Sequence, residues 1–152
     1  MTSANPETND AAAKPVRVAV QSLIYSEALA PDEISSRLDL QPTKTAEKGV
    51  KHGKRTGSPV DVPRNMWQLS SESHVTELDL TSHLDWMLSK LFPVREQLRT
   101  LRDNGTIECA LVGVVWTNGT SAHVRFETRQ MEMLVMLGME LQLEFADYGN
   151  DD

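Results

Sequence analysis

Residues 107–116, with the sequence IECALVGVVW, form the longest nearly continuous apolar stretch of the chain, and Asn118-Gly119 follows it closely. An apolar run without polar alternation is typical of a central strand that is covered on both faces. Asn-Gly is a strong signal for a tight hairpin turn, and the alternating residues 122–126 would form the returning strand. The sequence therefore predicts a hairpin at the centre of a sheet.

The flanking segments predict further strands and helices. Apolar alternation indicates strands over residues 16–25, 66–70 and 139–145. A proline followed by acids predicts a helix from Pro31 to about Leu38, and an apolar stripe with helical spacing runs from Leu80 to Leu91. A second helical segment follows Pro93, and another helix covers 128–137 and ends at Gly138. Residues 43–65 have no apolar period and are predicted to be a long loop.

This order of elements favours an α+β domain with an antiparallel-rich sheet and helices packed on one face. Without the first strand and helix, the remaining order is that of a ferredoxin-like fold, so the chain could be such a fold with an N-terminal strand and helix added. We expect one domain over residues 16–148. Residues 1–15 are polar and are predicted to be a disordered tail, and residues 149–152 form an acidic end.

Composition limits the classes of function. The single cysteine, Cys109, excludes an internal disulfide, and within an apolar strand we expect it to be an inaccessible thiol. No segment has the pattern of a signal peptide or a membrane span, which favours a cytoplasmic protein. The net charge of −7 argues against general nucleic-acid binding.

Charge is unevenly distributed along the chain. Residues 44–64 carry a local charge of +4, whereas the chain as a whole carries −7. This segment does not match a phosphate-binding P-loop, because the glycine spacing is wrong and Arg55 stands where a serine or threonine is needed. Its amines and open backbone could still bind an anion; a solvated loop is the simpler interpretation. The candidate binding residues are Lys48, Gly49, Lys51, His52, Lys54 and Arg55.

Two tryptophans complete the candidate site. Trp67 lies in the strand that follows the basic segment, so the loop could fold over it and close a cleft. Trp86 lies on the helix face opposite the apolar stripe, where either the basic segment or the residues after Pro93 cover it, or a partner contacts it.

No residue pattern indicates a catalytic pair, a metal site or a cofactor site, and the histidines lack ligand spacing. The leading hypothesis is a non-catalytic protein-binding or accessory module, for example an immunity-type protein, with an acidic partner. The alternative is a protein or enzyme that binds an anionic small molecule under the basic loop. The apolar last strand and the methionine-rich helix before it also favour a homodimer.

Several short motifs together resemble a bacterial family, domain of unknown function 4279. The matching positions are Pro31 to Ile34, Leu38 to Thr43, Lys48-Gly49, Trp67 to Ser70, Leu80 to Pro93 and Leu137 to Leu143. The resemblance extends over most of residues 16–148. It implies the same α+β fold and a bacterial cytoplasmic setting, and it implies no particular activity.

Overall fold

The structure is a computed structural model, and it describes residues 15–52, 59–119 and 122–147; for 50–52 and 59–60 it describes the backbone alone. The predicted N-terminal tail therefore lies outside the described residues except for Pro15, which begins the first strand. The acidic end at 149–152 and the candidate residues Lys54 and Arg55 also lie outside them.

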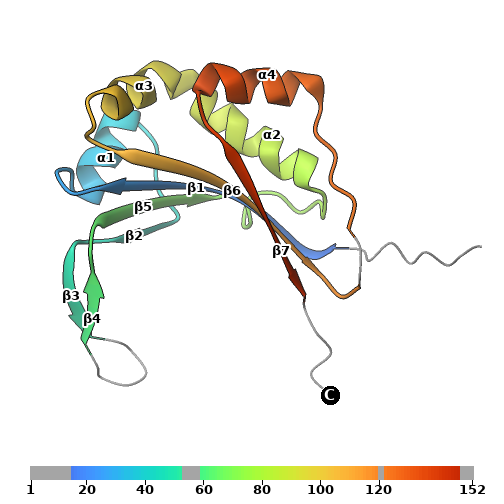
Figure 1. Ribbon diagram of the computed structural model, residues 1–152, viewed down its shortest axis with the longest axis horizontal. Helices are drawn as coiled ribbons and strands as arrows, with labels where there is room; N and C mark the ends of the chain where they lie inside the picture. The colour runs from blue at the N-terminus through green and yellow to red at the C-terminus, as the bar shows by residue number, and fades with distance from the viewer. Residues whose placement is uncertain (1–14, 53–58, 120–121, 148–152) are drawn as a thin grey trace, which may run out of the picture.

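A five-stranded sheet with the order β2-β5-β1-β6-β7 forms the base of the molecule (Figure 1). Each pair of neighbours is antiparallel except β6 and β7, which are parallel. The connection between these two parallel strands runs through a helix, as parallel neighbours require. The strands are β1 (Pro15–Ser26), β2 (Lys44–Ala46), β5 (Asn65–Ser70), β6 (Glu108–Thr117) and β7 (Leu141–Asp147).

The helices lie together on one face of this sheet (Figure 1). They are α1 (Pro31–Leu38), α2 (Leu80–Leu91), α3 (Arg95–Asp103) and α4 (Thr128–Leu137), and a short 3-10 helix (Phe92–Val94) joins α2 to α3. The predicted bounds of α1, α2 and α4 are thus confirmed, as is the α+β class with helices on one face. Proline at the start of α1 and the left-handed Gly138 (φ 65°) at the end of α4 supply the local signals.

The core lies between the helices and the sheet. Val18, Val20 and Ile24 of β1 are buried there together with Leu84 and Leu88 of α2. At Gly113 of β6 the packing is so close that a Cβ atom would lie 3.0 Å from Leu143 Cδ2 and 3.2 Å from each Leu80 methyl group. The glycine therefore lets the first turn of α2 approach the sheet.

The segment predicted to be a loop over residues 43–65 contains three short strands. β2 joins the main sheet, whereas β3 (Gly49–His52) and β4 (Pro59–Val62) pair with each other in a separate antiparallel ribbon that projects away from the helices (Figure 1). Strands of three or four residues that contain lysine, glycine and proline give no apolar period. We call β3 and β4 the ribbon.

The predicted hairpin after β6 is wrong. Residues 122–127 contain no strand, and the neighbour of β6 on that side is β7, which pairs with it in register from Leu111–Leu141 to Thr117–Asp147. Ala122, Val124 and Phe126 instead pack against the core as a connecting segment before α4. Because the ferredoxin-like order needs a strand here, that version of the fold is not formed.

Candidate functional site

The face of the sheet opposite the helices has an unusual composition. The register between β1 and β6 places Leu23 opposite Ala110 and Arg17 opposite Trp116, all on this side. Tyr25 opposite Met66 continues the same side onto β5. No helix among residues 15–52, 59–119 and 122–147 covers this face (Figure 1). The expectation that β6 is covered on both faces is therefore corrected.

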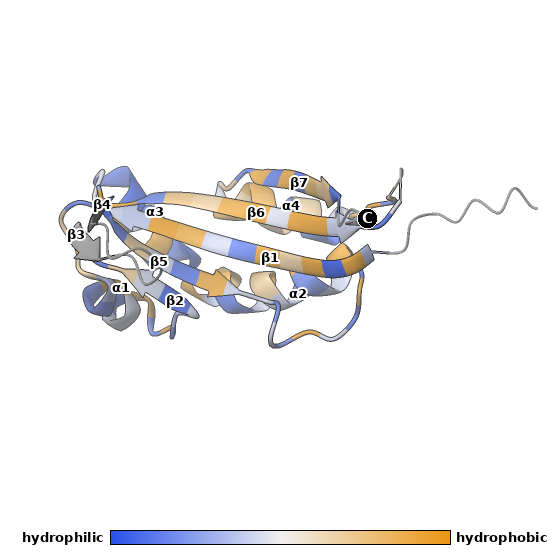
Figure 2. Cartoon of the chain, turned by 90° about the horizontal axis from the view of Figure 1, so that it is seen from below, coloured by the Kyte–Doolittle hydropathy of each residue, from blue (hydrophilic) through white to orange (hydrophobic). Residues whose placement is uncertain are grey.

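A sheet with one solvated face normally alternates apolar and polar residues, so the uncovered side should be polar. Here β6 is apolar on both sides, and Figure 2 colours most residues of this strand as hydrophobic. Val112 and Val114 are themselves buried on this side. We use the name uncovered face for the partly exposed apolar side chains there, which are Leu23, Tyr25, Met66, Ala110 and Trp116.

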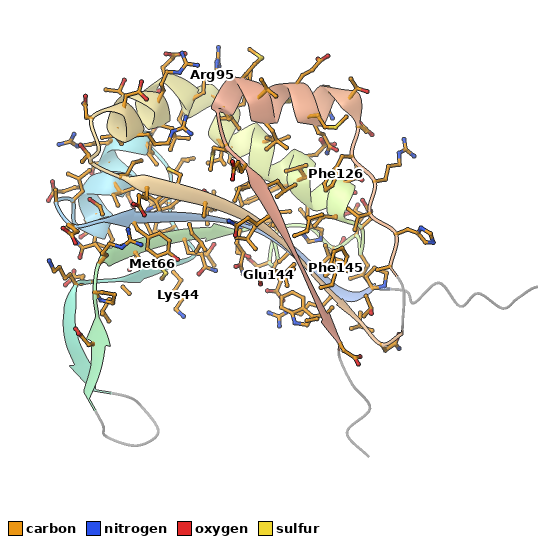
Figure 3. All side chains as sticks on the ribbon, viewed as in Figure 1. Lys44, Met66, Arg95, Phe126, Glu144 and Phe145 are labelled. Carbon is orange, nitrogen blue, oxygen red and sulfur yellow. The ribbon has the colours of Figure 1, made fainter. Side chains whose placement is uncertain are left out.

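Polar and charged side chains form the rim of the uncovered face. A groove of about 440 Å³ between β1, β5 and β2 is lined by Arg17, Lys44, Gln68, Ser70 and Glu72, among others. Lys44 and Met66 both point away from the helices in Figure 3. In the part of the chain that the structure describes, Lys44 makes no ion pair. The groove thus combines amide and hydroxyl groups with a cation available for a partner.

Arg17 occupies one end of this groove. Its Nη2 donates to Glu72 Oε2 at 2.7 Å, and its guanidinium lies 4.2 Å from the centre of the Trp116 ring. Hydrogen bonding to Arg17 lowers the pKa of the Glu72 carboxyl, against an opposing effect of burial. Arg17 therefore joins the apolar centre of the uncovered face to its polar rim.

The base of the ribbon lies at the other end of the sheet and is fixed by side chains. Asn65 Oδ1 accepts from the Lys48 backbone N–H at 2.7 Å, and Asn65 Nδ2 donates to the Leu29 carbonyl at 2.9 Å. Arg64 Nη1 donates to Glu108 Oε2 at 2.6 Å, and its guanidinium lies 4.7 Å above the Tyr25 ring. The ribbon is thus attached at the edge of the uncovered face.

The structure brings only some of the predicted site residues together. Lys48 is exposed at the start of the ribbon, and Gly49 follows it with φ 135°, a conformation that disfavours other residues. Lys51 and His52 form part of the β3 backbone. As far as it is described, the basic segment contains β2 of the main sheet and the ribbon, and it is not the long loop expected from the sequence.

Trp67 does not line the site. It is fully buried on the helix side of β5, where its Nε1 donates to Ser35 Oγ of α1 at 2.9 Å. Side chains alternate along a strand, so the neighbouring Met66 occupies the uncovered face instead. The expectation that the basic segment closes a cleft over Trp67 fails because α1 already covers this ring.

Trp86 lies in the helix layer, away from the ribbon. The His74 ring stacks on it with 4.6 Å between ring centroids, and Lys90 Nζ lies 5.6 Å from the ring centre. The segment before α2 and the helix itself therefore cover the ring in part, and this segment is not one of the two proposed from the sequence.

A serine–histidine pair that the sequence did not reveal lies in the core. Ser71 Oγ and His83 Nδ1 are 2.6 Å apart, and both residues are buried. Ser71 Oγ accepts from the Val20 N–H, and His83 Nε2 lies 2.7 Å from the Glu77 carbonyl. The serine proton therefore points to Nδ1 while Nε2 donates to the carbonyl. With each polar atom occupied and no exposed surface, the pair joins β1, the end of β5 and α2 as a structural link.

The described residues contain no group of three or more histidine, cysteine, aspartate or glutamate side chains arranged to hold a metal ion. Over the same part of the chain, each helix is too short or too polar to cross a bilayer.

These features define an α+β domain with a layer of helices on one sheet face and an uncovered, partly apolar opposite face with a basic ribbon at its edge. Residues 17–148 match the family described as domain of unknown function, DUF4279, and the chain belongs to that family. No curated protein and no solved structure matches the chain. The resemblance read from the sequence motifs is confirmed.

Proposed function

We propose that this chain is a non-catalytic protein-binding module that binds an acidic partner protein on the uncovered face. The observation that supports this proposal is the apolar composition of a sheet face over which no described helix packs. Contiguous apolar surface with a polar rim is typical of protein interaction sites. Tyr25 and Trp116 lie on this face, and tyrosine and tryptophan often contribute most of the binding energy at protein interfaces.

The charge around this face favours an acidic partner. Lys44 and the exposed Lys48 lie at the ribbon end, and the segment from 44 to 64 is basic in an otherwise acidic chain. Complementary charge of this kind steers association and sets specificity more than affinity. The setting that we propose is the bacterial cytoplasm, and the class is an accessory or immunity-type protein.

A photo-crosslinking residue at Met66 tests this proposal directly in the native cells. We expect a discrete adduct with one other protein, and a weaker adduct when Lys44→Glu is added, because that change reverses a charge at the rim. Val135 on α4 is the matched control, since it is 80% exposed but lies in the helix layer. Identical adducts from positions 66 and 135, or an adduct only with a second copy, would contradict the proposal.

The groove beside Lys44 supports a second candidate, an anionic small molecule. Its volume of about 440 Å³ lies within the range of small-ligand sites, and Lys44 and Gln68 offer donors to a phosphate or carboxylate. Inorganic phosphate at low salt should then raise the melting temperature of the wild-type chain and not of Lys44→Ala. An equal response of both proteins would remove this candidate.

A further inference from the structure

β7 is an edge strand without the usual protection against pairing. It lies at one end of the strand order and pairs, among the described strands, only with β6. Exposed edges are commonly blunted by shortness, lysine, proline or a bulge. The opposite edge follows this rule, because β2 has three residues and includes Lys44. β7 has seven residues, no lysine or proline, and an uninterrupted register with β6.

The side chains of β7 add exposed apolar surface to this open edge. Leu143 is 38% and Phe145 57% exposed, and both belong to the alternate positions paired with Gly113 and Val115 on the helix side. Glu144 points to the opposite side of the strand from Phe145 (Figure 3). An open backbone edge with an apolar face favours another strand as its occupant.

We infer that the occupant is β7 of a second copy of this chain, in antiparallel pairing about a two-fold axis through Leu143. In this register Leu143 faces its own equivalent, and Leu141 faces Phe145 of the second copy. On the other side of the strand Gln142 faces Glu144 of the second copy, so no two like charges are opposed. Aliphatic–aromatic cross-strand pairs of this kind stabilise antiparallel sheets.

The adjacent registers lack this complementarity. An axis through Glu144 would place the two Glu144 carboxylates directly opposite each other. An axis through Gln142 would place Glu140 opposite Glu144. Like charges at directly opposed positions are destabilising, so charge disfavours both registers adjacent to the one centred on Leu143. A two-fold axis also limits the assembly to a dimer, because the β7 edge of each copy is then paired with that of the other.

This dimer concerns the edge of the sheet and is independent of the partner proposed for the uncovered face. Light scattering of the full chain at tens of micromolar should give twice the 17.0 kDa mass of one chain. Leu143→Asp places two carboxylates on the axis and should give a folded monomer. The control Val135→Asp adds the same charge to an exposed apolar residue of α4 and should leave the dimer intact.

Gln142→Lys gives a gain-of-affinity test that does not depend on disrupting the edge. It places an ammonium opposite Glu144 twice in the dimer, which should lower the dissociation constant by roughly 2- to 30-fold at low salt. A monomeric wild-type chain would overturn the inference. A dimer that persists in Leu143→Asp but dissociates in Val135→Asp would also overturn it. The same holds if Gln142→Lys raises the dissociation constant of the dimer.

Discussion

Cys109 lies on the helix side of β6, directly opposite Ile24 of β1, and is partly buried. Burial raises the pKa of its thiol to about 11, with a smaller opposing effect from the nearby Arg102 charge. Because the thiolate is the nucleophile, the raised pKa suppresses the reactivity of this group at neutral pH. The sequence-based expectation of an inaccessible thiol is too strict, since the side chain retains some exposure.

We predict slow alkylation of Cys109 in the folded chain. At pH about 8 the thiolate fraction should be roughly 100-fold smaller than in the unfolded chain, because the pKa is about 11 against an ordinary value of 9.0. Iodoacetamide labelling followed by mass spectrometry measures this ratio. Rapid stoichiometric labelling of the native protein would contradict the assignment of Cys109 to the core side of β6.

The same shift predicts a dependence of stability on pH. A thiol whose pKa is raised on folding keeps its proton longer in the native state, so its stabilising effect is complete below pH about 9 and is lost as pH rises towards about 11. Urea unfolding across this window measures it. Cys109→Ala is the control. If the free energy of unfolding falls as steeply with pH in that variant, groups other than Cys109 cause the pH dependence.

The buried hydroxyl of Ser71 allows a prediction about stability. Ser71→Ala leaves the Val20 N–H and His83 Nδ1 without their partner in the core. A buried polar atom without a hydrogen bond costs about 1–3 kcal/mol, so we expect a loss of that size in the free energy of unfolding. Ser89→Ala, on the exposed side of α2, should change it little. Equal effects in denaturant titrations would argue against the structural link.

At the scale of elements, α3 holds the end of α4 in place. Arg102 Nη1 donates to the Gly138 carbonyl at 2.8 Å, and Arg99 Nη2 donates to the Met136 carbonyl at 3.3 Å. The last carbonyls of a helix lack intrahelical partners, so cations from a neighbouring helix stabilise them. Arg99 and Arg102 are therefore partners of the end of α4.

Arg102→Ala should therefore destabilise the α4–β7 junction. We expect a loss of about 1–2 kcal/mol, because charge-assisted hydrogen bonds to two adjacent carbonyls disappear together. Thermal unfolding measures the loss, and hydrogen exchange should rise first at the end of α4. Arg99→Ala is the matched control and should have less effect, because Arg99 makes one longer hydrogen bond to α4 and its ion pair with Glu96 lies within α3.

At the scale of the whole molecule, the described residues form one layer of helices on one layer of sheet, and two of the surfaces that this arrangement leaves open carry the proposals above. The uncovered face lies on the side of the sheet opposite the helices, and the β7 edge lies at one end of the strand order. Pairing at the edge would join two sheets side by side and leave both uncovered faces accessible. The two proposals are therefore compatible, and each can fail without the other.

The local signals of the sequence determined the helices. Proline at the first position of α1, the Asp79 side chain that accepts from Ser82 N–H at α2, and Gly138 after α4 each act within a few residues. Helix bounds depend on such neighbours, so they could be predicted from the chain alone. The alternation of β1 was equally readable, because one of its faces is buried against the helices.

Only the tertiary structure decided which strands pair and which faces are covered. β2 and the ribbon are too short and polar to give a periodic signal, and Asn118-Gly119 predicted a hairpin partner whose place β7 takes. The apolar run of residues 107–116 predicted that β6 is buried, but it did not show which face of β6 the helices cover. The reason is that an apolar residue gives the same sequence signal beneath a helix as on an uncovered sheet face. Strand pairing joins residues far apart in the sequence, and the free energy that selects among pairings comes from contacts that exist only after folding.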